Sequence, residues 1–533
     1  MSAVGFDFRE ERCVVAVAKE TGIFCIDEEQ CFLELDGGVN RTTRPKRSIT
    51  QIMRLIVGRP FSDPELQKDL KALPFSVTEG HDGFPLIHAR HLTRRSFTPI
   101  QVMGMVFSNM KGLAEKNLKA AVVDCCIGIP VYFTDHQRRA VLEAAKSAGL
   151  NPLRLMHETT ATALAYGLYQ RDLFEIKPLN VAFVDIGHDS MQVCIAGFKK
   201  GEMKILAHSF DRCVGGRDFD EVLFHNFAEQ LKSRYEIDVF QDASACFKLR
   251  SACDKLREEL RSNPEASLYV ECFIDQKFVR GFINRYEFGQ ITNSILDRVR
   301  KPVRKALSEA NIRVADDYVV EVVGLDSWVI KILKRFFGKE PRGTMNASEC
   351  VSSGCALQCA ILSPNYKVRE FQVHEILPFP IALQWKDNVT SFDGSCSGGT
   401  EDLQNCIVFP RGNPIPSVEV RTFYMSSKFR FDLQYVDASE LQAPAKIISF
   451  TVKAAQIFKR SLGDWPFYIN NPAIQGGSES WFEFAWMCLS ECTGTGFPVP
   501  VTIVEPLKGT TKIRSERGLT NEDVYECLTL SNT

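Results

Sequence analysis

The sequence lacks the marks of several protein classes. Its 18 cysteines include no Cys-x-x-Cys pair, and no apolar run comes near the roughly 20 residues that a membrane-spanning helix needs. The formal net charge is only −2, which gives no electrostatic reason to expect a nucleic acid or a membrane surface as a partner. The first residues, Met1-Ser2-Ala3, run straight into an apolar strand, so we expect no signal peptide.

These absences favour an intracellular protein. In a reducing compartment the cysteines are expected to be buried, small apolar residues rather than disulfide partners. We therefore expect a cytoplasmic location, with the nucleus as a second one. A basic stretch from Arg41 to Arg47 would fit a nuclear-import signal, although a solvated loop explains it as well.

Two segments share one pattern: an apolar strand that ends in an aspartate, a short polar turn and a second apolar strand. The first covers residues 4–18 and includes Asp7, and the second covers residues 182–196 and includes Asp185. Such a repeat predicts two related half-domains that face each other across a cleft. Aspartates at strand ends suit hydrated Mg²⁺, and the turns would then hold phosphate with backbone N–H groups. Two ordinary buried hairpins would give the same pattern.

Both turns have lost residues that phosphate binding favours. A turn that cradles phosphate needs small residues, above all glycine. The second turn keeps only Gly187, followed by His188 and Asp189. The first turn has no glycine and carries Glu10 and Glu11, which would repel phosphate.

Four further motifs occur in a characteristic order. They cover residues 127–135, 155–167, 214–220 and 346–356. In this order they resemble the actin-like ATPase domain of the 70-kDa heat-shock chaperones. Three other segments resemble the divergent 110-kDa branch of that superfamily, and its plant members above all. These segments cover residues 154–160, 356–364 and 368–371.

The resemblance extends over roughly residues 1–450 and implies an architecture. It implies an α/β actin-like two-lobed ATPase domain followed by an all-β sandwich, and we expect the helical lid of the family to be absent. The expected boundaries are residues 1–366 for the nucleotide-binding domain, 367–373 for the interdomain linker, 374–505 for the sandwich, which diverges after 455, and 506–533 for a C-terminal tail.

The resemblance also implies a site for ATP or ADP with Mg²⁺. Asp7 and Asp185 match the two aspartates that orient the waters of the metal, and Glu158 matches the glutamate that helps to align the attacking water. The other nucleotide contacts are expected in the turns, on the adenine-facing helix and in the adenosine motif, at Gly187, Ser190, Gly215, Gly216, Asp254, Arg257, Gly324 and Ser327.

Several positions depart from the pattern of the family. The catalytic lysine is replaced by Met53, which cannot offset the charge of a γ-phosphate. The adenosine motif carries Trp328 where the family has an arginine, and Arg261 replaces a serine. We therefore expect impaired catalysis, weak nucleotide binding at best and little hydrolysis.

Three functions remain open from the sequence. The first is a chaperone that holds unfolded polypeptides and acts as nucleotide exchange factor for a 70-kDa heat-shock partner. The second is a catalytically dead pseudo-ATPase that serves as an interaction module. The third is a truncated fragment without independent function, in which the missing lid and the shortened N-terminal lobe come from an incorrect gene model.

Overall fold

The computed structural model has two compact units. The first contains residues 1–132, 143–151 and 156–373, and the second contains residues 133–142, 152–155 and 374–533. The described residues are 3–9, 13–19, 22–26, 56–70, 76–91, 93–169, 177–271, 273, 278–316, 318–324, 327–363, 366, 371–386, 390–391, 403–415, 419–425, 429–441, 445–452, 467–469, 484–485 and 497–503.

The first unit begins with a sheet built on the first predicted hairpin. It contains four strands that are neighbours in the order β3-β2-β1-β7. These strands are β1 (Ala3–Phe8), β2 (Cys13–Lys19), β3 (Gly22–Ile26) and β7 (Asp124–Ile129). β1 runs antiparallel to β2, with Asp7 opposite Val14, and parallel to β7, with Asp7 opposite Gly128. Every residue of β1 is buried, as expected of an apolar strand in the middle of a sheet.

The second predicted hairpin lies in another sheet of the same unit, in which four strands are neighbours in the order β14-β9-β10-β11. These strands are β9 (Leu179–Ile186), β10 (Met191–Lys199), β11 (Glu202–Asp211) and β14 (Val319–Val323). Asp185 lies opposite Gln192 in the antiparallel pair of β9 and β10, and opposite Val323 in the parallel pair of β9 and β14. Each predicted hairpin therefore exists and carries its aspartate near the turn.

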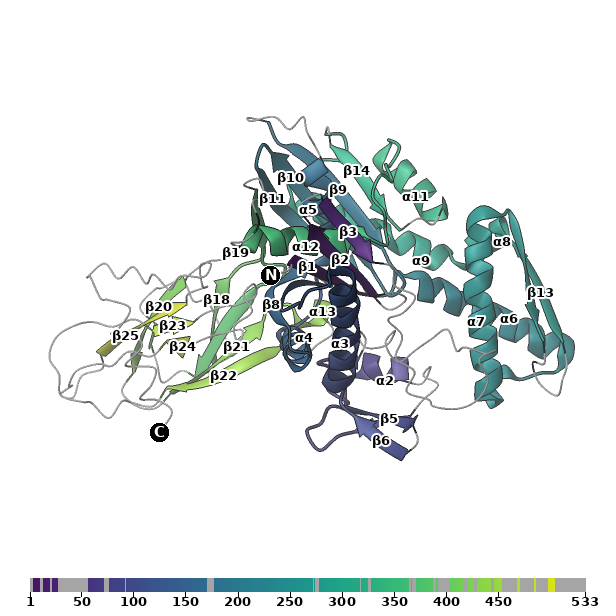
Figure 1. Ribbon diagram of the computed structural model, residues 1–533, viewed down its shortest axis with the longest axis horizontal. Helices are drawn as coiled ribbons and strands as arrows, with labels where there is room; N and C mark the ends of the chain where they lie inside the picture. The colour runs from purple at the N-terminus through teal and green to yellow at the C-terminus, as the bar shows by residue number, and fades with distance from the viewer. Residues whose placement is uncertain are drawn as a thin grey trace. The chain divides into compact units, whose positions relative to one another are not determined.

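Two helices pack against each other and against these sheets (Figure 1). They are α5 (Glu158–Tyr169), which contacts β9 and β10, and α12 (Cys350–Leu362), which contacts β1, β2 and β7. Their approach depends on Gly354, because a Cβ atom there would lie 1.9 Å from the carbonyl oxygen of Ala161. The helix α3 (Pro99–Leu118) packs against β2 and β3, and α10 (Arg300–Glu309) packs against β10 and β11.

The rest of the first unit surrounds this centre. A small sheet contains β4 (Val77–Glu79), β5 (Pro85–His91) and β6 (Thr93–Phe97). A second group shares one apolar core with the sheet of β9 and β10. Its elements are α6 (Gly216–Tyr235), η2 (Val239–Gln241), α7 (Ala243–Ser262), β12 (Glu265–Val270), β13 (Val279–Asn284), α8 (Arg285–Ile291) and α9 (Asn293–Arg298). Two more helices are α2 (Pro64–Leu70) and α11 (Ser327–Phe337).

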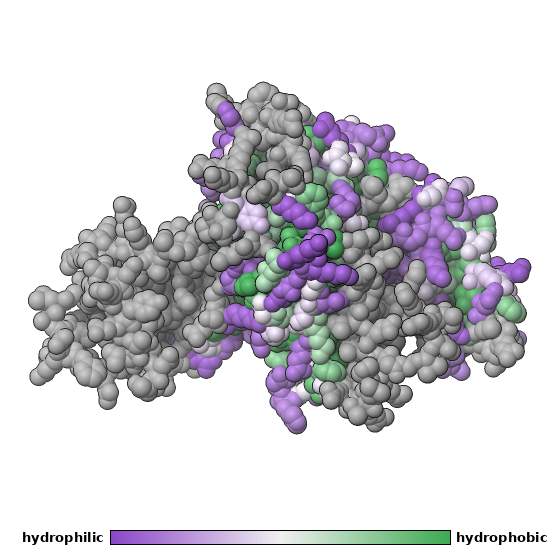
Figure 2. Space-filling view, viewed as in Figure 1, coloured by the Kyte–Doolittle hydropathy of each residue, from purple (hydrophilic) through white to green (hydrophobic). Residues whose placement is uncertain are grey.

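The face of the molecule in Figure 2 is mixed in character. Hydrophilic residues cover much of its described surface, and hydrophobic residues show between them at the end that carries α6 and β13. Exposed aromatic side chains on β12 and β13 include Tyr269 and Phe282. None of the helices within the described ranges is long and apolar enough to cross a membrane.

The second unit is rich in strands. One of its sheets has the order β18-β16-β21-β22, and another has the order β17-β20-β25-β23-β24. The strands are β16 (Ile381–Lys386), β17 (Thr390–Ser391), β18 (Leu403–Phe409), β19 (Pro414–Ile415), β20 (Glu419–Met425), β21 (Phe429–Tyr435), β22 (Lys446–Val452), β23 (Phe467–Ile469), β24 (Phe484–Ala485) and β25 (Phe497–Ile503). A short helix, α13 (Ala438–Leu441), lies between β21 and β22 in the chain.

Most local predictions were right, and one strand was wrong. The strand at 429–435 was predicted from its alternation, and Phe431 and Leu433 are buried as that pattern requires. A strand predicted over residues 376–383 is instead divided: β15 (Gln372–Ile376) ends, and β16 begins at Ile381. Pro378 and Pro380 lie in the gap, and because proline has no N–H group it interrupts a ladder of hydrogen bonds.

The predicted helix over residues 135–149 is α4 (Asp135–Ser147). Within the second unit, the Thr134 hydroxyl accepts a hydrogen bond from the Gln137 N–H at 3.4 Å, which caps the helix as expected. At the other end Gly149 has φ +68°, as its predicted role in a left-handed cap requires. β8 (Asn151–His157) follows. The predicted helix over 247–260 lies inside the longer α7.

One hydrogen bond in the second unit gives a stability prediction. The N–H of the buried Asp135 donates to the Tyr435 hydroxyl at 2.9 Å. Burial, followed by the nearby Asp135 carboxylate, raises the pKa of Tyr435, so the hydroxyl keeps its proton. We expect Tyr435→Phe to lower stability by about 1–3 kcal/mol, because it leaves a buried N–H without its acceptor. Tyr286→Phe, at a side chain that is 74% exposed, is the matched control. Equal thermal shifts for the two variants would contradict the prediction.

Candidate functional site

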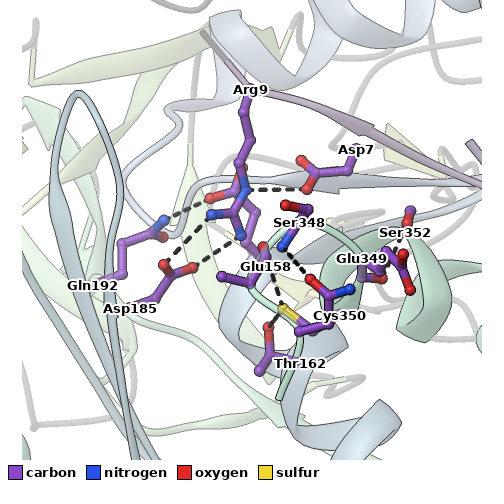
Figure 3. A network of polar contacts seen from close by, with 12 residues as sticks. Asp7, Arg9, Glu158, Thr162, Asp185, Gln192, Ser348, Glu349, Cys350 and Ser352 are labelled. Carbon is purple, nitrogen blue, oxygen red and sulfur yellow. Dashed lines mark hydrogen bonds and ion pairs between the residues drawn. The ribbon is translucent and has the colours of Figure 1, made fainter. Parts of the chain in front are cut away.

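The two predicted aspartates lie within reach of one side chain, that of Arg9 (Figure 3). Asp7 is near the end of β1 and Asp185 near the end of β9, and both are buried. They are 178 residues apart in the sequence, but the hairpins bring them together as the repeat predicted. Whether they orient the waters of a metal stays a prediction.

Arg9 holds the two carboxylates together. Its Nε donates to Asp7 Oδ2 at 3.0 Å, and one terminal nitrogen donates to Asp185 Oδ2, also at 3.0 Å. The other terminal nitrogen lies 3.4 Å from Asp185 Oδ1. The planar guanidinium thus grips Asp185 with two nitrogens and Asp7 with the third, a geometry that lysine cannot provide. We refer to this arrangement as the Arg9 bridge.

The charge on the Arg9 bridge is permanent. Burial by itself would lower the pKa of Arg9, but Asp185, Asp7 and Glu158 outweigh this effect and raise the pKa well above its ordinary value. Arginine therefore stays protonated at every pH at which the protein is folded. The site contains a fixed positive charge among three carboxylates.

Glu158 lies next to the bridge and has a polar partner of its own. It is the first residue of α5 and is buried. Its Oε2 accepts a hydrogen bond from Gln192 Nε2 at 2.6 Å, and Gln192 Oε1 accepts one from the Val131 N–H at 2.8 Å. Gln192 is the residue opposite Asp185 on β10. The hairpin therefore positions the predicted catalytic glutamate as well as the aspartate.

Four of the eight predicted nucleotide contacts lie in or next to the second turn. The Gly187 N–H donates to the Ser190 carbonyl at 3.0 Å, and the Gly216 N–H donates to the Gly187 carbonyl at 3.0 Å. The Gly215 N–H donates to Asp218 Oδ2 at 2.9 Å. Three backbone donors in the predicted phosphate region are thus engaged by the protein itself.

Side chains also occupy this turn. The Tyr132 hydroxyl donates to Asp189 Oδ2 at 2.9 Å and lies 3.2 Å from Ser190 Oγ. Both Asp189 and Ser190 are buried. An aspartate at this place adds negative charge next to the position predicted for phosphate, which opposes the binding of a polyanion.

Arg257 lies over the same turn. A Cβ atom on Gly216 would be 3.2 Å from the Arg257 guanidinium carbon. Arg257 Nε donates to Asp220 Oδ1 at 2.8 Å, and a terminal nitrogen donates to Asp254 Oδ1 at 3.1 Å. The side chain of Arg257 is only 2% exposed. Asp254 and Arg257 therefore contact each other, and acidic groups of the chain hold the arginine. Whether either residue contacts a nucleotide stays a prediction.

The adenosine motif joins the turn through Gly324. This glycine has φ +84°, and a Cβ atom there would lie 2.3 Å from the Ile186 carbonyl oxygen. Both features require glycine. Ser327 begins α11, but its side chain and that of Trp328 lie outside the described part of the structure. Met53, Glu10 and Glu11 also lie outside the described residues.

Comparisons with known proteins show the family of this chain. The Hsp70 protein family model matches residues 37–426. This chain belongs to the Hsp70 family. Heat shock 70 kDa protein 14 of Arabidopsis thaliana is 60% identical over 478 residues, which cover 86% of this chain and 57% of the relative. Heat shock 70 kDa protein 16 of the same organism is 42% identical over 474 residues, with 85% and 61% covered.

A human protein is also similar to this chain. Heat shock 70 kDa protein 4 of Homo sapiens is 37% identical over 470 residues, which cover 84% of this chain and 55% of the relative. This Hsp70-family chain thus belongs to a divergent branch of the superfamily, as its sequence indicated, and it spans little more than half the length of these relatives. Its mixed sheets and helices are consistent with an actin-like ATPase fold.

The residues of this Hsp70-family chain do not fit a magnesium ion at the aspartate pair. The carboxylate oxygens that would orient the waters of the metal accept hydrogen bonds from Arg9 instead. A divalent cation would also be repelled by the guanidinium between them. The scaffold of the predicted site is therefore present, but its centre holds a side chain of the protein.

The Arg9 bridge was not predicted from the sequence. The prediction for the first turn rests on Glu10 and Glu11 and gives Arg9 no role. One signal was available: Asp7 and Arg9 are two residues apart at the end of a strand, and alternate residues of a strand point to the same face. Asp220 and Gln192 were also missed, because their partners come from distant parts of the chain.

Asp218 makes the stability of this region depend on pH. Burial raises the pKa of its carboxyl to about 6, although Arg217 and the Gly215 N–H work against the rise. A pKa near 3.9 is ordinary for an unfolded chain. The folded form therefore binds the proton more tightly, so this contribution to stability is present at low pH and is lost as pH rises through about 6.

Asp218→Asn tests this linkage. The variant keeps an amide oxygen for the Gly215 N–H but has no charge to bury. We expect it to be more stable than wild type by about 1–2 kcal/mol at pH 7.5, and by less than half of that at pH 4.5. The difference between the urea midpoints of the variant and wild type, measured at both pH values, gives this gap in stability. Asp297→Asn, at a side chain that is 61% exposed, should show little gap at either pH. A gap for Asp218→Asn that does not shrink at low pH would be evidence against the assignment.

Proposed function

We propose that this chain works as a chaperone of the heat-shock 70 type that holds unfolded polypeptides and docks on a 70-kDa heat-shock partner without hydrolysing ATP itself. The family match and the relatives named as heat shock proteins support the chaperone class. The proposal combines two functions suggested by the sequence, since the chain would act as a chaperone through a catalytically silent actin-like domain. Exchange-factor activity towards the partner belongs to the same proposal.

The observation that carries the proposal is the Arg9 bridge. Phosphoryl transfer in this class of enzyme depends on positioned cations that neutralise the charge of the transferred phosphate. Here the positive charge at the aspartate pair is already bound to Asp7 and Asp185. The predicted lysine is replaced by Met53. Weak binding of ATP or ADP remains compatible with this arrangement, whereas rapid hydrolysis does not.

The strand-rich second unit is the proposed holder of polypeptide. We propose that its two sheets form the sandwich-like domain of the family over residues 374–505. Phe431 and Leu433 are buried and therefore belong to the core of the unit rather than to a binding surface.

Two assays test this function with the full chain. We expect it to suppress the aggregation of a heat-denatured model client to the same extent with and without MgATP. A fluorescent peptide should dissociate at the same rate with and without MgATP. Slow release that depends on ATP would contradict the proposal, because it needs a working nucleotide switch. Release of labelled ADP from a 70-kDa chaperone, with and without this chain, measures the exchange activity.

The location is proposed from the composition alone. We propose the cytoplasm, with the nucleus as a second location through the basic stretch at residues 41–47. A fluorescent fusion compared with a variant in which the arginines of this stretch are replaced by glutamine tests the nuclear part. Equal nuclear signal in both would exclude the stretch as an import signal.

A further inference from the structure

Three acidic side chains and one basic side chain meet at the centre of the first unit. Asp7, Asp185 and Glu158 are at most 3% exposed. Arg9 is paired directly with the two aspartates, and Glu158 also acts on its charge. Buried carboxylates are costly unless a positive charge or several donors compensate them. The arginine therefore supplies a charge that the acidic groups need.

We propose that Arg9 is a built-in cation that takes the place of a divalent metal ion, so that this site excludes Mg²⁺ and would bind it only after Arg9 is removed. The proposal deepens the proposed function and rests on its silent nucleotide site. It makes a separate claim, however, because a site that binds Mg²⁺ could still fail to hydrolyse ATP.

The positions of the donors support this replacement. A magnesium ion held through water needs carboxylate oxygens that accept hydrogen bonds from its waters. In this chain Nε and both terminal nitrogens of Arg9 point at those oxygens, at distances of 3.0 to 3.4 Å. The guanidinium therefore provides the same two things as the hydrated ion, which are positive charge and donors aimed at both aspartates.

The position of Arg9 in the chain ties this cation to the site. Arg9 directly follows β1, and Asp7 lies two residues before it on that strand. Its backbone is thus fixed close to the aspartate pair, and its side chain points between the two carboxylates with Glu158 nearby (Figure 3). A cation tethered at this distance has a high effective concentration compared with a free ion. Free Mg²⁺ would have to displace it from both partners.

The loss of Arg9 should leave a site suited to a metal. Without the guanidinium, Asp7 and Asp185 would be left on either side of the place that Arg9 occupied, with Glu158 nearby, so a hydrated ion could bridge the two aspartates. Carboxylate oxygens suit Mg²⁺ and Mn²⁺, both as ligands and as acceptors for the waters that these ions keep. Arg9→Ala and Arg9→Gln both remove the charge, and glutamine keeps much of the length of the side chain. Arg9→Lys keeps the charge but not the planar fork. The proposal predicts that only the two neutral variants gain a metal site.

Manganese is the probe, because its free ion gives a measurable paramagnetic resonance signal. The full chain is titrated with Mn²⁺ without nucleotide, and Mg²⁺ is then added as a competitor. We expect wild type to bind no Mn²⁺ at the aspartate pair, so Asp185→Asn should leave its Mn²⁺ titration unchanged. Arg9→Ala and Arg9→Gln should bind Mn²⁺ at least tenfold more tightly than wild type, Mg²⁺ should displace it, and the added change Asp185→Asn should abolish the gain.

A matched control separates this effect from the general loss of an arginine. Arg250 grips Glu221 with two nitrogens, at 3.0 and 2.9 Å, and its side chain is 18% exposed, close to the 19% of Arg9. Arg250→Ala should gain no Mn²⁺ site. Tight binding of Mn²⁺ by wild type at Asp185, or no gain in either neutral variant, would overturn the proposal. Because the wild-type titration needs no variant, the proposal can be tested even if Arg9→Ala does not fold.

The same preparations separate this proposal from the proposed function. ATP turnover by wild type would refute the silent site, whatever its metal binding. Binding of Mn²⁺ at the aspartate pair of wild type without turnover would refute only the replacement of the metal by Arg9.

Discussion

The full chain should turn over ATP at a rate that cannot be distinguished from a background without enzyme, and Glu158→Ala should not change that rate. The reason is electrostatic. Catalysis of phosphoryl transfer needs cations that are free to stabilise the charge on the transferred group, and the loss of one such cation typically costs a factor of about 10³–10⁵. Here the cation at the aspartate pair is bound to Asp7 and Asp185, and Met53 stands where the resemblance predicts a lysine.

Variants that return the missing residues one step at a time test the same prediction further. Met53→Lys alone should leave turnover at background, because the Arg9 bridge stays in place. Arg9→Gly combined with Met53→Lys should be the first variant in this series to show Mg²⁺-dependent turnover, because it frees the aspartates and returns the charge. Release of labelled phosphate under steady-state conditions is the measurement, and Arg250→Ala is the control. Robust turnover by wild type that Glu158→Ala abolishes would show that the site is not silent.

The aspartate pair could be predicted from the sequence because it depends on local patterns. Two apolar strands with an aspartate near each turn were enough to place Asp7 and Asp185 at equivalent points, and the repeat implied that they face each other. Gly187 follows from the same repeat, whereas Gly324 was predicted from the family resemblance, and its backbone does require glycine. Each of the two hairpin patterns lies within one short stretch of the chain, residues 4–18 and 182–196.

The Arg9 bridge and the contacts of Arg257 could not be predicted in this way. Each depends on where side chains from distant segments point once the sheets have packed. Asp185 is 176 residues from Arg9, and Asp220 is 37 residues from Arg257. Arg257 matched a lysine of the family and was therefore expected to contact nucleotide, but two aspartates hold it. A resemblance transfers the position of a residue, whereas its partners depend on the other substitutions around it.

Gly354→Ala should destabilise the protein strongly, although it adds only one methyl group. The two helices that frame the site cross at this residue, and the new Cβ atom would lie 1.9 Å from the Ala161 carbonyl oxygen and 2.4 Å from its carbon. Both are backbone atoms of α5, so no side chain can rotate away. Relief of the clash requires the helices to move apart, and overpacking of this kind costs about 3 kcal/mol or more.

Gly112→Ala is the matched control for that substitution. Gly112 lies in α3, and a Cβ atom there would have no neighbour within 4 Å. Alanine in an open helical position should raise stability by about 0.5–1 kcal/mol. The two variants make the same chemical change in different surroundings. Because only the one at Gly354 is crowded, their urea midpoints should move in opposite directions. A Gly354→Ala protein as stable as wild type would mean that α5 and α12 do not approach each other closely at this point.

Gly354→Ala should also disturb the candidate site, because both helices that cross at Gly354 begin near it. Glu158 is the first residue of α5, and Cys350 is the first residue of α12. Cys350 lies close enough to the bridge to act on the charge of Arg9. When the helices separate, Glu158 should move relative to Arg9 and Gln192. We therefore expect Gly354→Ala to loosen the Arg9 bridge, which faster hydrogen exchange of the 185–192 hairpin would report. Unchanged exchange there, in a destabilised variant, would show that the bridge holds independently of the helix pair.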